Sequence, residues 1–148
     1  MRLWDIVRDI IVREEVELLR RVEIPKLKIP VEVSKVTSVS ERTLSEPWEL
    51  YVDGIGYVEV IIIKTTDTNW RLTVRTEQGL QYYNATFSDL QNIALGNPML
   101  DAQDRTAVEG FYFVAIKKIK FLEEFSFIFT PTPSTYVKLL YVLYYVMR

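Results

Sequence analysis

The C-terminal residues 136–146 constrain the fold of this chain more than any other segment. They read Tyr-Val-Lys-Leu-Leu-Tyr-Val-Leu-Tyr-Tyr-Val, with Lys138 as the only charged side chain. Successive side chains of a strand point to opposite faces, so this segment is apolar on both faces. A strand of this kind needs a covering layer on each side. The segment therefore predicts a packed β architecture and says little about chemistry.

Length and composition predict one globular domain. The chain has 148 residues, of which 49% are hydrophobic and 13% are aromatic. A chain of this length buries roughly 70% of the surface that its unfolded form exposes. We therefore expect a single core that is rich in tyrosine and phenylalanine.

The sequence contains no cysteine and no histidine, which excludes several kinds of chemistry. Disulfides, thiol nucleophiles and Cys-ligated metals cannot form, and the commonest general base and transition-metal ligand are both missing. The net charge is −2, from 18 basic and 20 acidic residues, which is unlike the basic balance of a phosphate-binding domain. Residues 36–105 hold ten acidic and five basic side chains, a balance typical of a solvated face. We expect no nucleic-acid partner.

Neither end of the sequence predicts export or a membrane span. Residues 1–9 carry acidic side chains within an apolar stretch and lack a small-residue cleavage site, so they do not match a secretory signal. The longest uncharged apolar run, 139–147, is far shorter than the ~20 residues that a spanning helix needs. We expect a soluble protein, located in the cytoplasm or in a virion.

Residues 3–21 predict an amphipathic helix, because most of their apolar side chains fall on one broad stripe at ~100° per residue. Val12, Val16 and Leu19 lie on the opposite side of that helix. The helix therefore either packs on its own domain or leaves apolar surface free for a neighbouring subunit.

Residues 22–33 alternate apolar and polar side chains and predict an extended arm. Pro25 and Pro30 lack backbone donors, which excludes a central strand and suits an edge strand or an arm. The Ser/Thr-rich residues 34–45 are predicted to connect this arm to the body, so we divide the chain into an N-terminal helix and arm at 1–35 and a β-sandwich domain at 36–148. An edge strand within the same domain would have the same pattern. The candidate subunit contacts are Trp4, Ile11, Leu18, Leu27, Ile29, Val31 and Val33.

Short strands are predicted at regular intervals from residue 48 onward. Residues 48–52 and 57–63 are predicted to pair as a hairpin, because the intervening Gly54 and Gly56 suit a tight turn. Further strands are predicted at 70–76, 80–86, 108–116, 119–121, 125–130 and 137–147, with Trp70, Leu72 and Val74 pointing inward.

One short helix is predicted to interrupt the strands. Residues 87–95 follow Thr86, a suitable N-cap, and end before Gly96, and residues 99–105 are predicted to form a loop. The fold class that follows is mainly β, a single antiparallel β-sandwich or jelly roll with an N-terminal helix or arm and one short inserted helix.

Carboxylates are the only plentiful acid–base groups, and a glycosidase needs just two of them at a defined separation. Turn geometry already explains several of them, and the 101–104 loop lacks the glycine and terminal glutamate of a calcium loop. No phosphate-binding glycine motif is present either. We therefore expect no catalytic residue, no cofactor and no metal, and interpret these carboxylates as surface turns: Asp53, Glu59, Asp67, Asp101, Asp104 and Glu109.

Exposed aromatic residues offer a possible platform for a sugar or another ligand. The candidates are Trp48, Tyr82 and Tyr83, whereas strand spacing places Trp70 in the core. Residues 117–120 form the only basic cluster and predict a solvated turn or an edge protected by lysine.

The layout of the chain resembles that of small β-sandwich virion proteins of phages and archaeal viruses, such as capsid decoration proteins and minor capsid or tail components. The arm at 22–33, the predicted hairpin at 48–63 and the closing strands at 116–121 and 125–129 carry this resemblance. It implies a structural role, and it transfers no functional residue. The absence of Cys and His, together with frequent Ile, Tyr, Glu, Lys and Arg, is typical of a thermophilic host.

We therefore expect a non-enzymatic structural or assembly protein, either a homo-oligomer or part of a viral structural lattice, that oligomerises through its N-terminal arm. The alternative is a β-sandwich module that binds a carbohydrate or another ligand.

Overall fold

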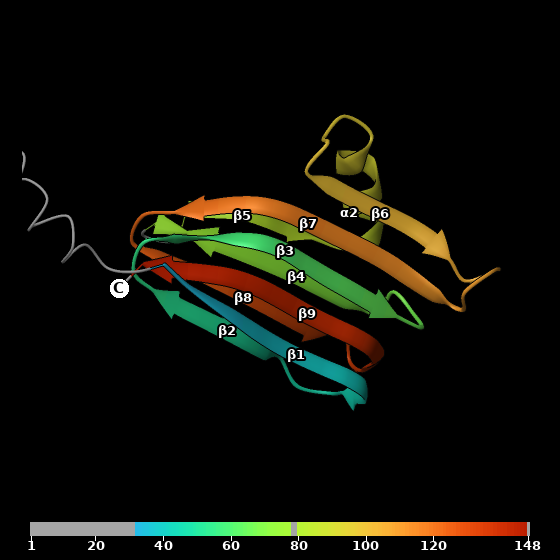
Figure 1. The fold of residues 1–148 in the computed structure, drawn as a ribbon. Coiled ribbons are helices and arrows are strands. Elements are labelled where there is room, and N and C mark those ends of the chain that lie inside the picture. The colour runs from blue at the N-terminus through green and yellow to red at the C-terminus, as the bar shows by residue number, and fades with distance from the viewer. Residues whose placement is uncertain (1–31, 78–79, 148) are drawn as a thin grey trace, which may run out of the picture. The chain divides into compact units, whose positions relative to one another are not determined.

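The computed structural model describes residues 32–77 and 80–147, which form two antiparallel sheets packed as a sandwich with one short helix. The predicted mainly β sandwich and its inserted helix are confirmed. The front layer of Figure 1 is a five-stranded sheet. In spatial order, its strands are β1 (Glu32–Leu44), β9 (Thr135–Met147), β3 (Gly56–Thr65), β7 (Phe111–Phe121) and β6 (Leu100–Arg105).

The second layer is a four-stranded sheet behind the first (Figure 1). In spatial order, its strands are β2 (Trp48–Asp53), β8 (Glu124–Pro131), β4 (Trp70–Thr76) and β5 (Leu80–Ala85). Helix α2 (Phe87–Ala94) follows β5 and packs beside β6.

The strands pair as though one long antiparallel ribbon had been folded over. β1 pairs with β9, β2 with β8, β3 with β7, and β4 with β5, so pairing proceeds from the two ends of this region toward its middle. Strand β6 is an addition that extends the sheet beyond β7. Most of these contacts join residues far apart in sequence, so local patterns alone do not determine them.

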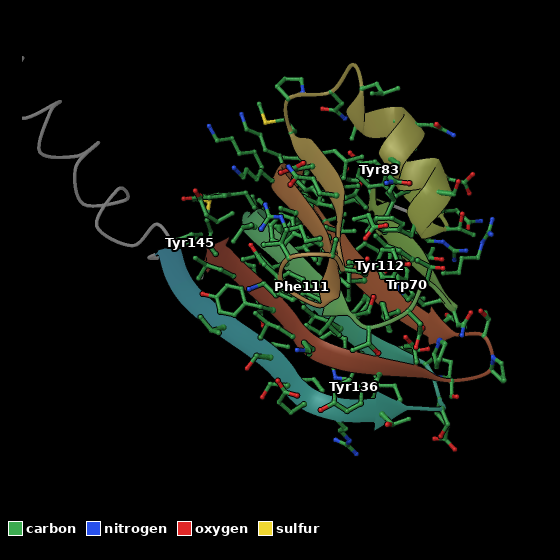
Figure 2. All side chains as sticks on the ribbon, turned by 90° about the vertical axis from the view of Figure 1, so that its right-hand side faces the viewer. Trp70, Tyr83, Phe111, Tyr112, Tyr136 and Tyr145 are labelled. Atoms are coloured by element: carbon green, nitrogen blue, oxygen red, sulfur yellow. The ribbon has the colours of Figure 1, made fainter. Side chains whose placement is uncertain are left out.

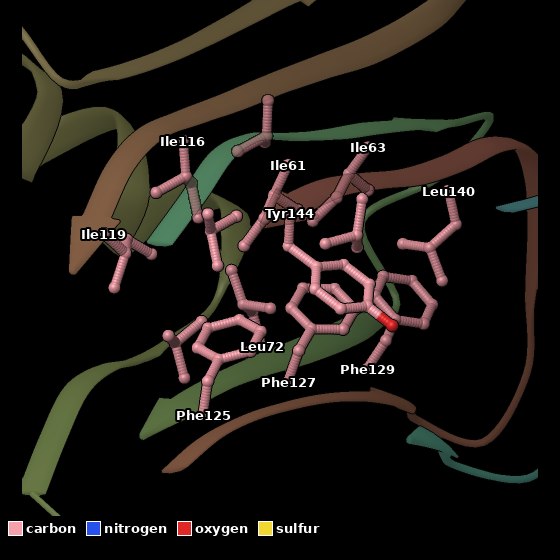
Figure 3. Packing of buried hydrophobic residues seen from close by; sticks show 14 of the residues in the cluster. Ile61, Ile63, Leu72, Ile116, Ile119, Phe125, Phe127, Phe129, Leu140 and Tyr144 are labelled. Carbon is pink, nitrogen blue, oxygen red and sulfur yellow. The ribbon is translucent and has the colours of Figure 1, made fainter. Parts of the chain in front are cut away.

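The core lies between the two sheets and is aromatic on one side and aliphatic on the other. Figure 3 shows Phe125, Phe127 and Phe129 of β8 facing the aliphatic side chains of the five-stranded sheet. Each of these three phenylalanines is fully buried. In β4, Trp70, Leu72 and Val74 are buried, as the alternation predicted. The opposing aliphatic residues are Val58, Ile61, Ile63, Val114, Ile116, Ile119, Val137, Leu140 and Val142.

Buried polar groups at one end of the core satisfy one another. The indole Nε1 of Trp70 donates to Thr65 Oγ1 at 3.0 Å and to the Asp67 carbonyl at 3.2 Å. The Asp67 carboxylate accepts from the Thr135 hydroxyl at 2.5 Å. The β3–β4 turn is thereby joined to the start of β9, because an unpaired buried polar group would be costly.

Helix α2 begins where the sequence predicts and ends one residue earlier, at Ala94. Thr86 Oγ1 accepts from the Asp89 backbone N–H at 3.4 Å, and the Asp89 carboxylate accepts from the Thr86 N–H at 3.1 Å. These two bonds form a capping box, which satisfies donors that the first turn leaves free. Phe87 and Leu90 are buried and attach the helix to the core.

The predicted hairpin between residues 48–52 and 57–63 is wrong. β2 pairs with β8 in one sheet, and β3 pairs with β7 and β9 in the other, so the chain crosses between layers at this turn. Gly54 has φ 121°, and its N–H donates to the Glu123 carbonyl at 2.8 Å. Glycine allows this sharp bend as readily as a hairpin turn, so the local signal is the same.

Two segments predicted to lack regular structure are strands. Residues 99–105 were predicted to form a loop, and Leu100–Arg105 is β6, paired with β7. Residues 34–45 were predicted to form a connection, and they lie mostly in β1. Both are edge strands with polar side chains, which solvent tolerates on the free side of a sheet.

Strand β7 is continuous where two strands were predicted. Lys118 adopts φ 59° within Phe111–Phe121 and interrupts the alternation without ending the strand. The predicted start at Val108 is also wrong, because residues 106–110 form a turn before β7.

Candidate interaction face

The outer side of the five-stranded sheet carries apolar and aromatic side chains on its central strands. These side chains alternate with the buried residues of β9 and β3 and point away from the core. All are half-buried, except that Val36 is 56% exposed. We call this surface the outer apolar face and define it by Val36, Tyr57, Val60, Ile62, Phe113, Leu139, Tyr141, Leu143 and Tyr145.

No described strand or helix lies in front of this surface (Figure 1). The sequence predicted that β9 needs cover on both sides, and the four-stranded sheet supplies one of them. Within residues 32–77 and 80–147, the second side of β9 faces outward. The face therefore has the composition of a buried surface without a covering layer in this part of the chain.

The outer side of the four-stranded sheet is different. Its outward positions on β2, β8 and β4 are mostly charged or hydroxylated, and Ile128 is the only aliphatic residue among those described. An antiparallel sheet with one solvated side has this alternation of apolar and polar residues. The polar positions are Glu49, Tyr51, Asp53, Arg71, Thr73, Arg75, Glu124, Ser126 and Thr130.

Aromatic and aliphatic neighbours hold the outer apolar face together. Tyr57 and Tyr145 stack with ring centroids 4.7 Å apart and an interplanar angle of 24°. Ile62 lies opposite Tyr141 in the register of β3 and β9. Figure 2 shows Tyr145 on the outer side of β9 and Trp70 between the two layers. Cross-strand pairs of this kind stabilise a sheet and order its surface.

Cationic side chains of β3 and β6 lie against aromatic rings of β7. Lys64 Nζ lies 5.0 Å from the centre of the Phe111 ring, and the Arg105 guanidinium lies 4.0 Å from that of Phe113. Lys64 is on β3 between Leu139 and Phe113, at one end of the face, and these distances suit cation–π attraction. The end of the face is therefore basic, while its centre is uncharged.

The lysine cluster lies at a local edge of the sheet. β6 pairs with β7 only as far as Ile116, and the Lys117 N–H donates to the Met99 carbonyl at 2.8 Å, so residues 118–121 have β3 on one side and no described strand on the other. Lys117, Lys118 and Lys120 are exposed there. The predicted solvated turn is wrong, and the alternative of an edge protected by lysine is confirmed.

Two adjoining hollows lie at the lysine end of the face. One, of about 190 Å³, is lined by Tyr57, Glu59, Lys118 and Lys120. The other, of about 270 Å³, shares Tyr57 and Lys120 and extends to Leu122. Each is small and combines an aromatic ring with an ammonium group.

The residues predicted as a ligand platform do not lie together. Trp48 is on β2, where its ring packs edge-on against Phe127 at 5.7 Å. Tyr83 is on β5, at the opposite edge of the same sheet, and Asn97 Nδ2 donates to its hydroxyl at 3.3 Å. The side chain of Tyr82 lies outside the described residues. A third hollow, of about 230 Å³, involves Trp48 and the 42–47 segment.

Of the predicted subunit contacts, only Val33 belongs to a described strand. It lies in β1 opposite Val146, and its side chain is outside the described set. The remaining six, Trp4, Ile11, Leu18, Leu27, Ile29 and Val31, lie outside the described residues.

The candidate carboxylates form local bonds. Asp104 accepts from the hydroxyl and backbone N–H of Thr106, which lowers the pKa of its carboxyl. Asp101 accepts from Gln103, and Glu109 lies 3.9 Å from Arg105. Among residues 32–77 and 80–147, no group of three or more acidic side chains is placed to hold a metal ion.

Two exposed tyrosine–glutamate bonds complete the charged surface. Tyr136 donates to Glu41, and Tyr51 donates to Glu124 at 2.8 Å. Each bond raises the pKa of its tyrosine, because the neutral phenol is the donor. Neither tyrosine is thereby activated as a base near neutral pH.

No family model matches this sequence, and a search of curated proteins finds no match. In the part of the chain that the structure describes, α2 is the only helix, and it is too short and too polar to cross a membrane.

A signal for the outer apolar face was present in the sequence beyond β9. Residues 57–63 read Tyr-Val-Glu-Val-Ile-Ile-Ile, so β3 is also largely apolar on both sides. Two such runs indicate two neighbouring central strands, and β3 and β9 are adjacent in the sheet.

Proposed function

We propose that this protein is a non-enzymatic structural protein that assembles through contacts between subunits, as a capsid-associated or decoration component of a virion. The observation that carries the proposal is the contrast between the two outer surfaces of the sandwich. One is polar, as solvent requires, and the other is largely apolar over the central strands β9 and β3, with Val36 of β1 and Phe113 of β7 beside them. Exposed apolar surfaces of this extent mark protein interaction sites.

The strand order supports a finer fold assignment. Apart from β6, the first strand pairs with the last and the second with the second-last. This leaves β1, β9, β3 and β7 in one sheet and β2, β8, β4 and β5 in the other, an order that supports a jelly roll. Jelly rolls occur in viral capsid proteins and in lectins. Since fold alone does not determine function, this likeness supports a virion role by analogy.

The N-terminal sequence supplies a second proposed contact. Residues 1–31 precede β1, and β1 is an edge strand of the five-stranded sheet. The alternating pattern of Leu27, Ile29 and Val31 suits a strand that pairs with the edge of a neighbouring subunit. A lattice needs at least two different contacts for each subunit, and an arm together with a face meets that need.

The chemistry of the described side chains favours binding over catalysis. Asp101 and Asp104 bond to residues two positions away, and the raised pKa values of Tyr51 and Tyr136 keep both phenols neutral near pH 7. A general acid–base pair needs groups whose pKa values are shifted toward the working pH.

A second candidate function is recognition of a small acidic ligand, such as an acidic sugar. The two hollows at the lysine end favour it, because Tyr57 offers a stacking surface next to Lys118 and Lys120. Titration with acidic and neutral oligosaccharides, followed by calorimetry, tests it. Binding that is lost in Lys120→Ala would support this function over assembly.

Light scattering on two forms of the chain tests the proposed assembly through the arm. One form is the full chain, and the other begins at Glu32, so that β1 is retained. We expect the full chain to form a defined oligomer and the shorter form to have a lower mass with the same circular dichroism. Equal masses for the two forms would contradict a role for residues 1–31.

A further inference from the structure

We propose that the outer apolar face binds the same face of a second copy of this chain, in a two-fold dimer whose axis runs parallel to the strands. This inference rests on the proposed assembly function and names the partner of its main surface. It does not involve residues 1–31.

The size of the face suits a second copy. It spans four strands, and on β9 it extends from Leu139 to Tyr145. At ~4.8 Å between strands and ~3.3 Å per residue, the patch measures about 19 Å by 23 Å, or roughly 440 Å² for each copy. Two such patches bury roughly 900 Å² in total, which is the size of a weak interface that dissociates on dilution.

The chemistry of the face also suits contact with an identical surface. Its centre, formed by Ile62, Tyr141 and Leu143, is apolar and uncharged. Tyrosine rings carry large apolar area and a hydroxyl that can bond across an interface, and they are frequent in such contacts. Two sheets with the same twist can also pack face to face, with about 10 Å between the sheets.

The charges determine the direction of the two-fold axis. An axis across the strands would place β7 on β7 in opposite directions, so Lys117 and Lys120 of one copy would approach Lys64 and Arg105 of the other. Like charges across an interface cost several kcal/mol. An axis parallel to the strands avoids this arrangement.

With the axis parallel to the strands, Lys117 on β7 of one copy meets β1 of the other. The described outward residues of β1 opposite β9 are Val36, Ser38 and Ser40, which carry no charge. They are also small beside the tyrosines of β9, so they leave room for the long lysine side chains of the partner copy.

Charge substitutions in the full chain test the face directly. Val36→Lys places an ammonium group opposite Lys117 of the second copy, and because Val36 is 56% exposed the monomer tolerates the change. Ile62→Lys places a charge at the centre. We expect each to raise the dissociation constant of the dimer by at least about tenfold in sedimentation velocity, with unchanged near-ultraviolet circular dichroism.

Two matched substitutions serve as controls. Ile128→Lys is matched to Ile62→Lys, since it replaces an outward isoleucine of β8 on the polar side of the sandwich. Val108→Lys repeats the other change at a turn residue that is 90% exposed. We expect both controls to retain the dimer of the unmodified chain.

Cross-linking tests the axis. The chain has no cysteine, so the double variant Val36→Cys with Lys117→Cys introduces the only thiols. In the proposed dimer these positions face each other across copies, and a bismaleimide that spans about 10 Å should join them. Cross-linked dimer with the double variant and none with either single variant supports the axis. No cross-linked dimer with the double variant overturns it.

The outcomes separate this inference from the proposed function. If both face variants keep the oligomer of the unmodified chain, the face is not the interface, and assembly by other contacts stands. If the unmodified full chain remains at 17.4 kDa at every concentration, both the face dimer and assembly from copies of this chain are overturned.

Discussion

Tyr57 and Tyr145 lie directly opposite each other on β3 and β9, and their rings stack at 4.7 Å on the outer apolar face. The close approach of the two strands depends on Gly56, since a Cβ at that position would lie 1.9 Å from the Tyr145 carbonyl oxygen. The first residue of β3 thus helps to determine the surface that we propose as the interface. The packing of Tyr145 therefore depends on the absence of a side chain at Gly56, although the two residues are far apart in the chain.

Gly56→Ala should destabilise the fold by about 1–3 kcal/mol, because backbone atoms have to move to admit the methyl group. Gly96→Ala is the matched control, since a Cβ there meets nothing within 4 Å. We expect the control to change stability by less than about 1 kcal/mol. Urea unfolding of the two variants measures both effects, and equal stabilities would contradict the close approach of β3 and β9.

Tyr145→Ser should weaken association more than it weakens folding. Loss of one aromatic stack costs roughly 0.5–1.5 kcal/mol of monomer stability, whereas a tyrosine within an interface contributes more than about 1 kcal/mol from each copy. Tyr51→Ser is the control on the polar side, where Tyr51 is 63% exposed. Dilution series in the ultracentrifuge compare the two, and equal dissociation constants would count against the face.

Phe127→Ala should destabilise the domain by about 3–5 kcal/mol, because it empties a fully buried site between the sheets. The neighbouring Ile128 points outward, and Ile128→Ala should cost about 1 kcal/mol or less. Thermal unfolding of the two variants provides the comparison. Similar midpoints would show that β8 does not face the core as described.

The capping box of α2 should weaken at low pH. Bonds from the Thr86 backbone and hydroxyl keep the pKa of Asp89 below its ordinary value in the folded protein. Its stabilising contribution is therefore complete above the pKa of the unfolded chain, about 4, and is lost as the pH falls through the lower folded value.

A comparison of the unmodified chain with Asp89→Asn measures this contribution. The difference in thermal midpoint should be constant above about pH 5 and should shrink below about pH 4. A difference that stays the same down to pH 2 would mean that the Asp89 carboxylate does not cap the helix.

Local patterns predicted the parts of the fold that depend on neighbours in sequence. The alternation of Trp70, Leu72 and Val74 and the cap at Thr86 are examples, because the alternation of buried side chains in a strand and the capping of a helix each depend on residues only a few positions apart. Pairing partners did not follow from such patterns. Gly54 and Gly56 suggested a hairpin, whereas β2 and β3 pair with strands more than forty residues later in the chain.

The candidate interaction face was predictable only in part. The apolar character of β9 on both sides was evident from the sequence, and it indicated a surface that needs cover. Which residues join β9 in that surface depends on the strand order, which brings Ile62 beside Tyr141 and Val36 beside Leu143. The sequence suggested Trp48 and Tyr83 as one platform, and the same strand order separates them to opposite edges.

The mass of the full chain in solution, measured by light scattering over a range of concentrations, tests the proposed assembly most directly. We expect a mass of at least twice 17.4 kDa at micromolar concentration, falling on dilution. A mass of 17.4 kDa at every concentration would contradict assembly through copies of this chain.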